Sequence, residues 1–216
     1  MNILIHACLK RNWYVYKHLI PSLLAQGIKE NEIHVWMDIA KDGNLKSFLN
    51  SCYACSLQPG GTWHLQDDVI ISRNFAEMVR KCDEGVVCGF SNDDFGPFVG
   101  AGGVQPSILM WNSFPCIRIP NELAEEFYIW FYNYAINKPE YRDRIRENKS
   151  DDWFWQQFIN EKHGEDLRVF NMKPNIVDHI DYLIGGSVIN DGRTKSIYRA
   201  AYWVDEDLVE ALKQSI

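Results

Sequence analysis

The chain has 216 residues, of which 46% are hydrophobic and 13% aromatic, a composition that supports a packed globular core and excludes a disordered protein. Its 29 acidic and 22 basic residues give a formal net charge of −7, which argues against a broad, nonspecific phosphate-binding surface. No apolar run approaches the ~20 residues that a membrane span requires, and the opening residues do not resemble a signal peptide. We therefore expect one cytoplasmic domain without a membrane span.

Strands and helices alternate through the first 90 residues. Apolar runs predict strands at 2–8, 31–38, 60–68 and 84–90, and helical spacing predicts helices at 12–27, 42–55 and 72–82. Pro21 should kink or divide the first helix, and Ser72 is the expected N-cap of the third. This order is typical of an α/β domain with a mainly parallel sheet flanked by helices.

The pattern changes after residue 99. A glycine-rich loop in 99–105 leads into an apolar run, a strongly aromatic helix is predicted at 121–137, and a helix that begins with two carboxylates is predicted at 150–164. The sequence contains no internal repeat, low-complexity segment or linker. We therefore expect the second half to pack against the first sheet as one unit.

The six cysteines are expected to be reduced thiols, because the chain lacks a secretory signal. Cys52 and Cys55 have CxxC spacing, but no second such pair completes a zinc site. The two cysteines could be ligands of a structural zinc ion or simply partly buried residues of a helix, and the second reading is favoured.

Polar residues stand where the predicted parallel strands end. His6 and Asp38 lie near the ends of the first two strands, and Asp67 and Asp68 end the third. Ligands of such sheets bind beyond the carboxyl ends of the strands. Two adjacent carboxylates there suit Mg²⁺ or Mn²⁺, although one could instead cap the next helix while the other is solvated.

Three further features permit more than one reading. The glycine loop lets the backbone approach a ligand closely, or is an ordinary turn. Asp151 and Asp152, in the first turn of a helix, could both serve the helix dipole, or one could act as a general base. His179 could be a core histidine, a metal ligand or a proton carrier.

Together these motifs resemble the GT-A class of glycosyltransferases, whose DxD-like motif holds a metal on the diphosphate of a nucleotide sugar. "QDD" resembles the variant "EDD", with Gln66 in place of glutamate, so that Asp68 matches the metal ligand and Asp67 the acid near sugar or ribose. "KPNIVDHID" resembles the run that carries the C-terminal metal-binding histidine, here His179. The class also has an xED motif, whose aspartate is the catalytic base in inverting members. "SDD" at 150–152 resembles this motif, so that Asp152 matches the base and Asp151 stands where glutamate is usual.

The resemblance also implies donor-binding positions. The opening "LIHACLKRN" is similar to the segment that holds the nucleobase, and Asp38 resembles the acid near base or ribose. The candidates are His6, Ala7, Arg11, Asp38 and the loop glycines Gly100, Gly102 and Gly103. The implied fold is a Rossmann-like GT-A domain over residues 1–216, with a nucleotide-binding half at about 1–98 and an acceptor half at about 99–216.

The implied activity is transfer of a hexose from a nucleotide-diphosphate sugar, most typically a UDP-sugar, to an acceptor hydroxyl. Mn²⁺ or Mg²⁺ would assist, and the anomeric configuration would invert. The acceptor could be a saccharide, a protein or a hydroxymethylated base in DNA. Two alternatives remain, a nucleotidyltransferase and a non-catalytic nucleotide-sugar-binding module. The first is disfavoured because the N-terminal region has no glycine- and lysine-rich loop to bind a triphosphate.

Two further features also permit more than one reading. Glycines and cations in residues 185–200, among them Arg193, Lys195 and Arg199, could form a lid over a diphosphate or an ordinary surface loop. Aromatic residues could stack on a sugar or a base, although core packing is the commoner role; these are Trp63, Trp153 and Trp155.

Overall fold

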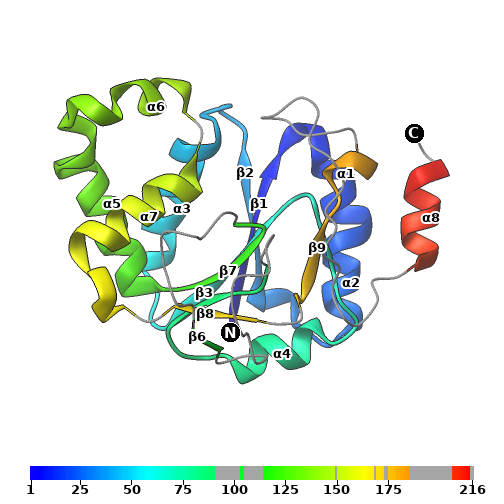
Figure 1. Ribbon diagram of the computed structural model, residues 1–216. Coiled ribbons are helices and arrows are strands. Elements are labelled where there is room, and N and C mark those ends of the chain that lie inside the picture. Colours follow the sequence, from blue (N-terminus) through cyan, green and yellow to red (C-terminus); the bar gives the residue numbers. More distant parts are fainter. Residues whose placement is uncertain are drawn as a thin grey trace.

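Seven strands form the central sheet of the computed structural model, which describes residues 1–90, 103–104, 114–148, 150–167, 169–172, 175–184 and 206–214 (Figure 1). Their order across the sheet is β2-β1-β3-β7-β5-β8-β6. The strands are β1 (Asn2–Cys8), β2 (Ile33–Asp38), β3 (Gly61–Gln66), β5 (Val86–Cys88), β6 (Gly103–Val104), β7 (Cys116–Pro120) and β8 (Val169–Asn171). Strands β1, β2, β3, β5 and β8 run in one direction, and β6 and β7 run against them. The expected α/β class with a mainly parallel sheet is confirmed.

The first three strands lie close to their predicted positions. β1 pairs in parallel with β2 on one side and with β3 on the other. β2 begins at Ile33, later than predicted, because a short 3₁₀ turn (Glu30–Glu32) precedes it. Both faces of β1 and β3 are covered, which is why their sequences are nearly continuous apolar runs, whereas the edge strand β2 has no fully buried residue.

The first helical segment is interrupted, as Pro21 predicts. It consists of α1 (Asn12–Tyr14), a π-helical turn (Val15–Leu19) and α2 (Ile20–Ala25). Proline donates no backbone hydrogen bond, and its ring crowds the carbonyl four residues before it. The wider π turn, in which the Ile20 amide bonds the Val15 carbonyl, accommodates this disruption without ending the helix.

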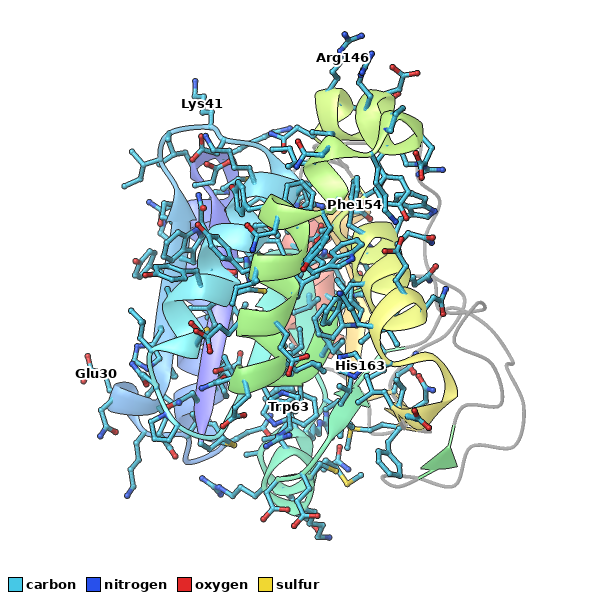
Figure 2. The ribbon with its side chains drawn as sticks, turned by 90° about the vertical axis from the view of Figure 1, so that its left-hand side faces the viewer. Glu30, Lys41, Trp63, Arg146, Phe154 and His163 are labelled. Atoms are coloured by element: carbon cyan, nitrogen blue, oxygen red, sulfur yellow. The ribbon has the colours of Figure 1, made fainter. Side chains whose placement is uncertain are left out.

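One face of the sheet is covered by α3 (Asn44–Ser56), α5 (Asn121–Asn133) and α7 (Asp151–Lys162), which lie side by side in Figure 2. Their core is aromatic: the Phe127 ring lies 5.2 Å from Trp155 and 5.4 Å from Phe158. α5 stops at Asn133, short of its predicted end. The smaller helices of this region are Ala135–Asn137, Pro139–Tyr141, α6 (Arg142–Glu147) and Gly164–Asp166.

The other face is covered by α1, α2 and α4 (Phe75–Lys81), and α8 (Glu206–Gln214) packs on the same side, farther from the sheet than α2 (Figure 1). The expected N-cap of α4 is wrong: the N-cap position belongs to Asn74, and the Ser72 hydroxyl donates to the Asn74 side chain at 2.8 Å. A separate two-stranded sheet, β4 (Val69–Ile71) with β9 (Val177–His179), packs on this face.

All six cysteines are free thiols, as expected. On α3, Cys52 is buried and Cys55 half-buried. Trp63 and Trp155 lie in the core with 1% and 0% exposure, so the packing reading holds for both. In the part of the chain that the structure describes, no helix combines the length and the apolar character of a membrane span.

A polar cluster lies between the sheet and α3. The His6 Nε2 atom is 3.0 Å from His64 Nδ1 and 3.2 Å from the Ser51 hydroxyl, which itself donates to the Phe48 carbonyl. The two imidazole rings stack at 5.3 Å. Burial lowers the pKa of His6 to about 4, and burial together with His6 lowers the pKa of His64 well below its usual value. Both rings are therefore neutral in the folded protein at neutral pH.

We expect the free energy of unfolding to fall as the pH drops below 6.5. In that range the unfolded chain protonates its histidines and the fold keeps His6 neutral, so the unfolded state binds more protons and is favoured, by up to about 3 kcal/mol near pH 4. Urea titrations between pH 7 and pH 5 measure the slope. His6→Gln should make the slope shallower, with the contribution of His64 remaining, whereas His34→Gln, a change at an exposed residue of β2, should leave it unchanged. An equal slope in wild type and His6→Gln contradicts this account.

Candidate metal and donor site

The acidic residues of the first half meet at one edge of the sheet. Cys8, the last residue of β1, lies opposite Asp38, the last residue of β2. On the other side of β1, β3 ends at Gln66, and a turn formed by Asp67 and Asp68 follows directly. These carboxylates therefore lie where the parallel strands end, which is where the sequence predicts a ligand site.

Asp67 is buried and strongly bonded. Its Oδ1 atom lies 2.8 Å from Arg11 Nη1, and its Oδ2 atom accepts the Cys8 backbone amide at 2.7 Å. Burial and the neighbouring Asp68 raise the pKa of Asp67, while Arg11 and the Cys8 amide oppose that rise. Asp67 is thus held against the end of β1 and does not cap a helix.

Asp68 joins three distant segments. Its Oδ2 atom lies 2.6 Å from Arg11 Nη1 and 3.0 Å from His179 Nε2. Its backbone carbonyl accepts the Ile180 amide at 2.8 Å, and the antiparallel pairing of β4 with β9 puts Val69 opposite His179. The small second sheet is therefore the element that carries His179 to the acidic pair. The structure brings together the two residues that the resemblance implies as metal ligands.

A further acid, Asp181, lies beside Asp68 and His179. Asp181 Oδ1 lies 3.8 Å from His179 Nδ1, and one ligand atom each of Asp68, His179 and Asp181 lie within 4.8 Å of one another. All three residues are buried. Sequence reasoning missed Asp181, although a second acid two residues after the histidine in "DHID" was a usable signal.

The donor set fits a hard divalent cation. Carboxylate and imidazole ligands suit Mn²⁺, and carboxylates suit Mg²⁺. Ligands held at about 2.1 Å in an octahedron are about 3 Å apart, close to the 3.0 Å between Asp68 Oδ2 and His179 Nε2. Among the described residues this is the one group with such geometry, and it contains no cysteine.

The other donor candidates of the first half have structural partners. Ala7 is buried in the core, so its side chain faces away from a ligand. Both carboxylate oxygens of Asp38 accept backbone amides of its own turn, from Asp42 at 2.7 Å and Gly43 at 3.2 Å. His6 bonds His64, and Arg11 bonds both aspartates. The structure therefore shows His6, Arg11 and Asp38 engaged within the protein.

Asp151 and Asp152 join the same edge of the sheet. Asp151 Oδ1 accepts the Asn44 side chain at 2.6 Å, and Asn44 begins α3 directly after the Asp38 turn. Asn148 strengthens this junction, since its Oδ1 accepts the Lys46 amide at 3.1 Å. Burial, and then the charge of Asp152, raise the pKa of Asp151 to about 7. Asp152 is half-buried, and one of its oxygens accepts the Trp153 amide at 2.7 Å.

The remaining candidates are only partly described. Gly103 opens β6 and pairs with Asn171 at the carboxyl end of β8, so it lies in a short strand. Gly100, Gly102 and the expected lid at 185–200 lie outside the described residues. Trp153 is half-buried, and Arg144 lies over its ring at 4.4 Å.

No family model matches this chain, and no curated protein matches it. Similar solved structures include a mannose-1-phosphate geranyltransferase from Thermus thermophilus, at 13% identity and a TM-score of 0.39 over 79% of this chain and 73% of that one. Another is the galactosyltransferase LgtC in complex with donor and acceptor sugar analogs, at 12% identity and a TM-score of 0.42 over 100% of this chain and 96% of that one. Both names denote transferases. TM-scores of 0.39 and 0.42 carry no information on the chemistry of this chain.

Proposed function

We propose that this chain is a GT-A-type glycosyltransferase that moves a hexose from a nucleotide-diphosphate sugar, a UDP-sugar in the first instance, to an acceptor hydroxyl. The observation that carries the proposal is the buried group of Asp68, His179 and Asp181 at the carboxyl edge of a mainly parallel sheet. A divalent cation at that edge can meet a diphosphate that enters beyond the ends of the strands.

Asp68 and His179 would hold Mn²⁺ or Mg²⁺, with Asp181 as a further ligand. When bound, the cation supplies Lewis-acid stabilisation of the charge that grows on the departing diphosphate. Asp67 is fixed beside it by Arg11 and the Cys8 amide, which suits a carboxylate that orients a sugar or ribose hydroxyl. The cation would thus be bound by residues from both halves of the chain, about 1–98 and about 99–216.

The acceptor oxygen would attack the anomeric carbon as the bond to the diphosphate oxygen breaks, inverting the configuration. Asp152 would take the proton of the acceptor hydroxyl. Its half-buried position leaves it open to an acceptor, whereas Asp151 is buried and bonded to Asn44. We assign Asp151 the role of positioning the first turn of α7. The acceptor half would begin near residue 99.

The nucleotide is proposed to bind along the ends of β1 and β2. His6, Arg11 and Asp38 contribute there, and Ala7 contributes through its backbone because its side chain is in the core. The glycines Gly100, Gly102 and Gly103 are proposed to lie along the donor sugar.

A donor panel tests this proposal. Purified protein is incubated with UDP- and GDP-sugars and Mn²⁺, first alone and then with a saccharide, a protein extract or DNA that contains hydroxymethylated bases. Release of nucleoside diphosphate supports a glycosyltransferase, and the acceptor that accelerates the release identifies the acceptor class. Pyrophosphate release from a nucleoside triphosphate would instead identify a nucleotidyltransferase, and binding without turnover a non-catalytic module.

We predict that Asp68→Asn lowers turnover by about a hundredfold or more, because it removes a charged oxygen ligand while preserving side-chain volume. Activity is measured at limiting Mn²⁺, and the melting temperature is measured alongside. Asp143→Asn, at a carboxylate exposed on α6, is the matched control and should retain full activity. Near-wild-type turnover of a folded Asp68→Asn variant would show that the ligand assignment is wrong.

We predict that Asp152→Asn lowers kcat by about 10²–10⁴-fold and leaves donor affinity near that of the wild type, because proton transfer matters in the transition state. Steady-state kinetics with isothermal titration of the donor separate the two effects. Asp151→Asn, the neighbouring isosteric change, should cost less in kcat. The opposite order would exchange the two roles, and retention of anomeric configuration in the product would remove the base role from both.

A further inference from the structure

Arg11 lies inside the proposed metal site, in contact with both carboxylates of the acidic pair. The residue is 4% exposed and ends the short 3₁₀ turn (Leu9–Arg11) that follows β1. A single nitrogen, Nη1, lies 2.8 Å from Asp67 Oδ1 and 2.6 Å from Asp68 Oδ2. One guanidinium thus compensates two buried carboxylates at once.

The oxygen that Arg11 binds is also the oxygen nearest to His179. Asp68 Oδ2 lies 3.0 Å from His179 Nε2, the spacing expected of two ligands of one divalent cation. A cation coordinated by these two atoms would stand next to the Arg11 nitrogen. The cation and the Arg11 guanidinium would then be neighbouring positive charges in a buried site, and they would repel each other strongly.

We propose that Arg11 competes with the divalent cation for Asp68. The Asp68 carboxylate is paired with the Arg11 guanidinium when no metal is bound, and with the cation when the metal binds. The contact with Asp67 keeps Arg11 in place when Asp68 turns to the metal. Arg11 therefore sets the metal affinity of the donor-free protein, and keeps the buried acidic pair compensated while no metal is bound. The inference rests on the metal site of the proposed function.

The test is Mn²⁺ binding without a nucleotide sugar, followed by isothermal titration or by the electron paramagnetic resonance signal of free Mn²⁺. Arg11→Met should bind Mn²⁺ about tenfold more tightly or better, because the competing charge is gone and both carboxylates remain. Lys17→Met removes a cation at an exposed position of the first helical segment, and matches the change in net charge. It should bind Mn²⁺ as the wild type does.

A second readout covers the case in which Arg11→Met is poorly folded. Mn²⁺ should then raise the melting temperature of Arg11→Met more than that of the wild type, since the cation replaces the lost compensation. Arg11→Lys, which keeps the charge without the planar fork, should lie between the two in affinity. If Arg11→Met binds Mn²⁺ no more tightly than the wild type, or is stabilised by Mn²⁺ no more than the wild type, the role proposed for Arg11 is wrong, while the metal site itself still stands. Absence of Mn²⁺ binding in every variant overturns the metal site as well.

Discussion

Two adjacent carboxylates are buried at the end of β3, and the free-energy cost of removing their charge from water governs the architecture around them. Asp67 and Asp68 are 5% and 6% exposed. Arg11 bonds both of them, the Cys8 amide bonds Asp67, and His179 lies against Asp68. Removing one of these partners would leave a buried charge that is less well compensated.

The residues that compensate the pair come from distant parts of the chain, so the site depends on the whole fold. The parallel pairing of β1 with β3 aligns Cys8 with the turn after β3. The antiparallel ladder of β4 with β9 delivers His179 and, just beyond it, Asp181. On the opposite helix layer, Asn44 ties Asp151 to the turn that follows β2. Three separate contacts thus assemble one acidic edge.

Local patterns were sufficient to predict much of this arrangement. The apolar runs of β1, β2 and β3 identified their strands, and the strand-end rule placed Asp38, Asp67 and Asp68 at one edge. Two facts were out of reach, because they depend on pairing between distant segments: the insertion of β7 between β3 and β5, and the separate β4–β9 sheet. The resemblance linked Asp68 to His179, but neither pattern nor resemblance showed that Arg11 would bind both acids or that Asp181 would join them.

The most direct test of the central claim is an anomalous-scattering map of crystals grown with Mn²⁺ and UDP. The account predicts one strong manganese peak within coordination distance of the Asp68 carboxylate and the His179 imidazole, beside the diphosphate at the ends of β1 and β3. A manganese peak elsewhere on the molecule, with Asp68 still bonded to Arg11 and His179 at saturating Mn²⁺, would contradict it.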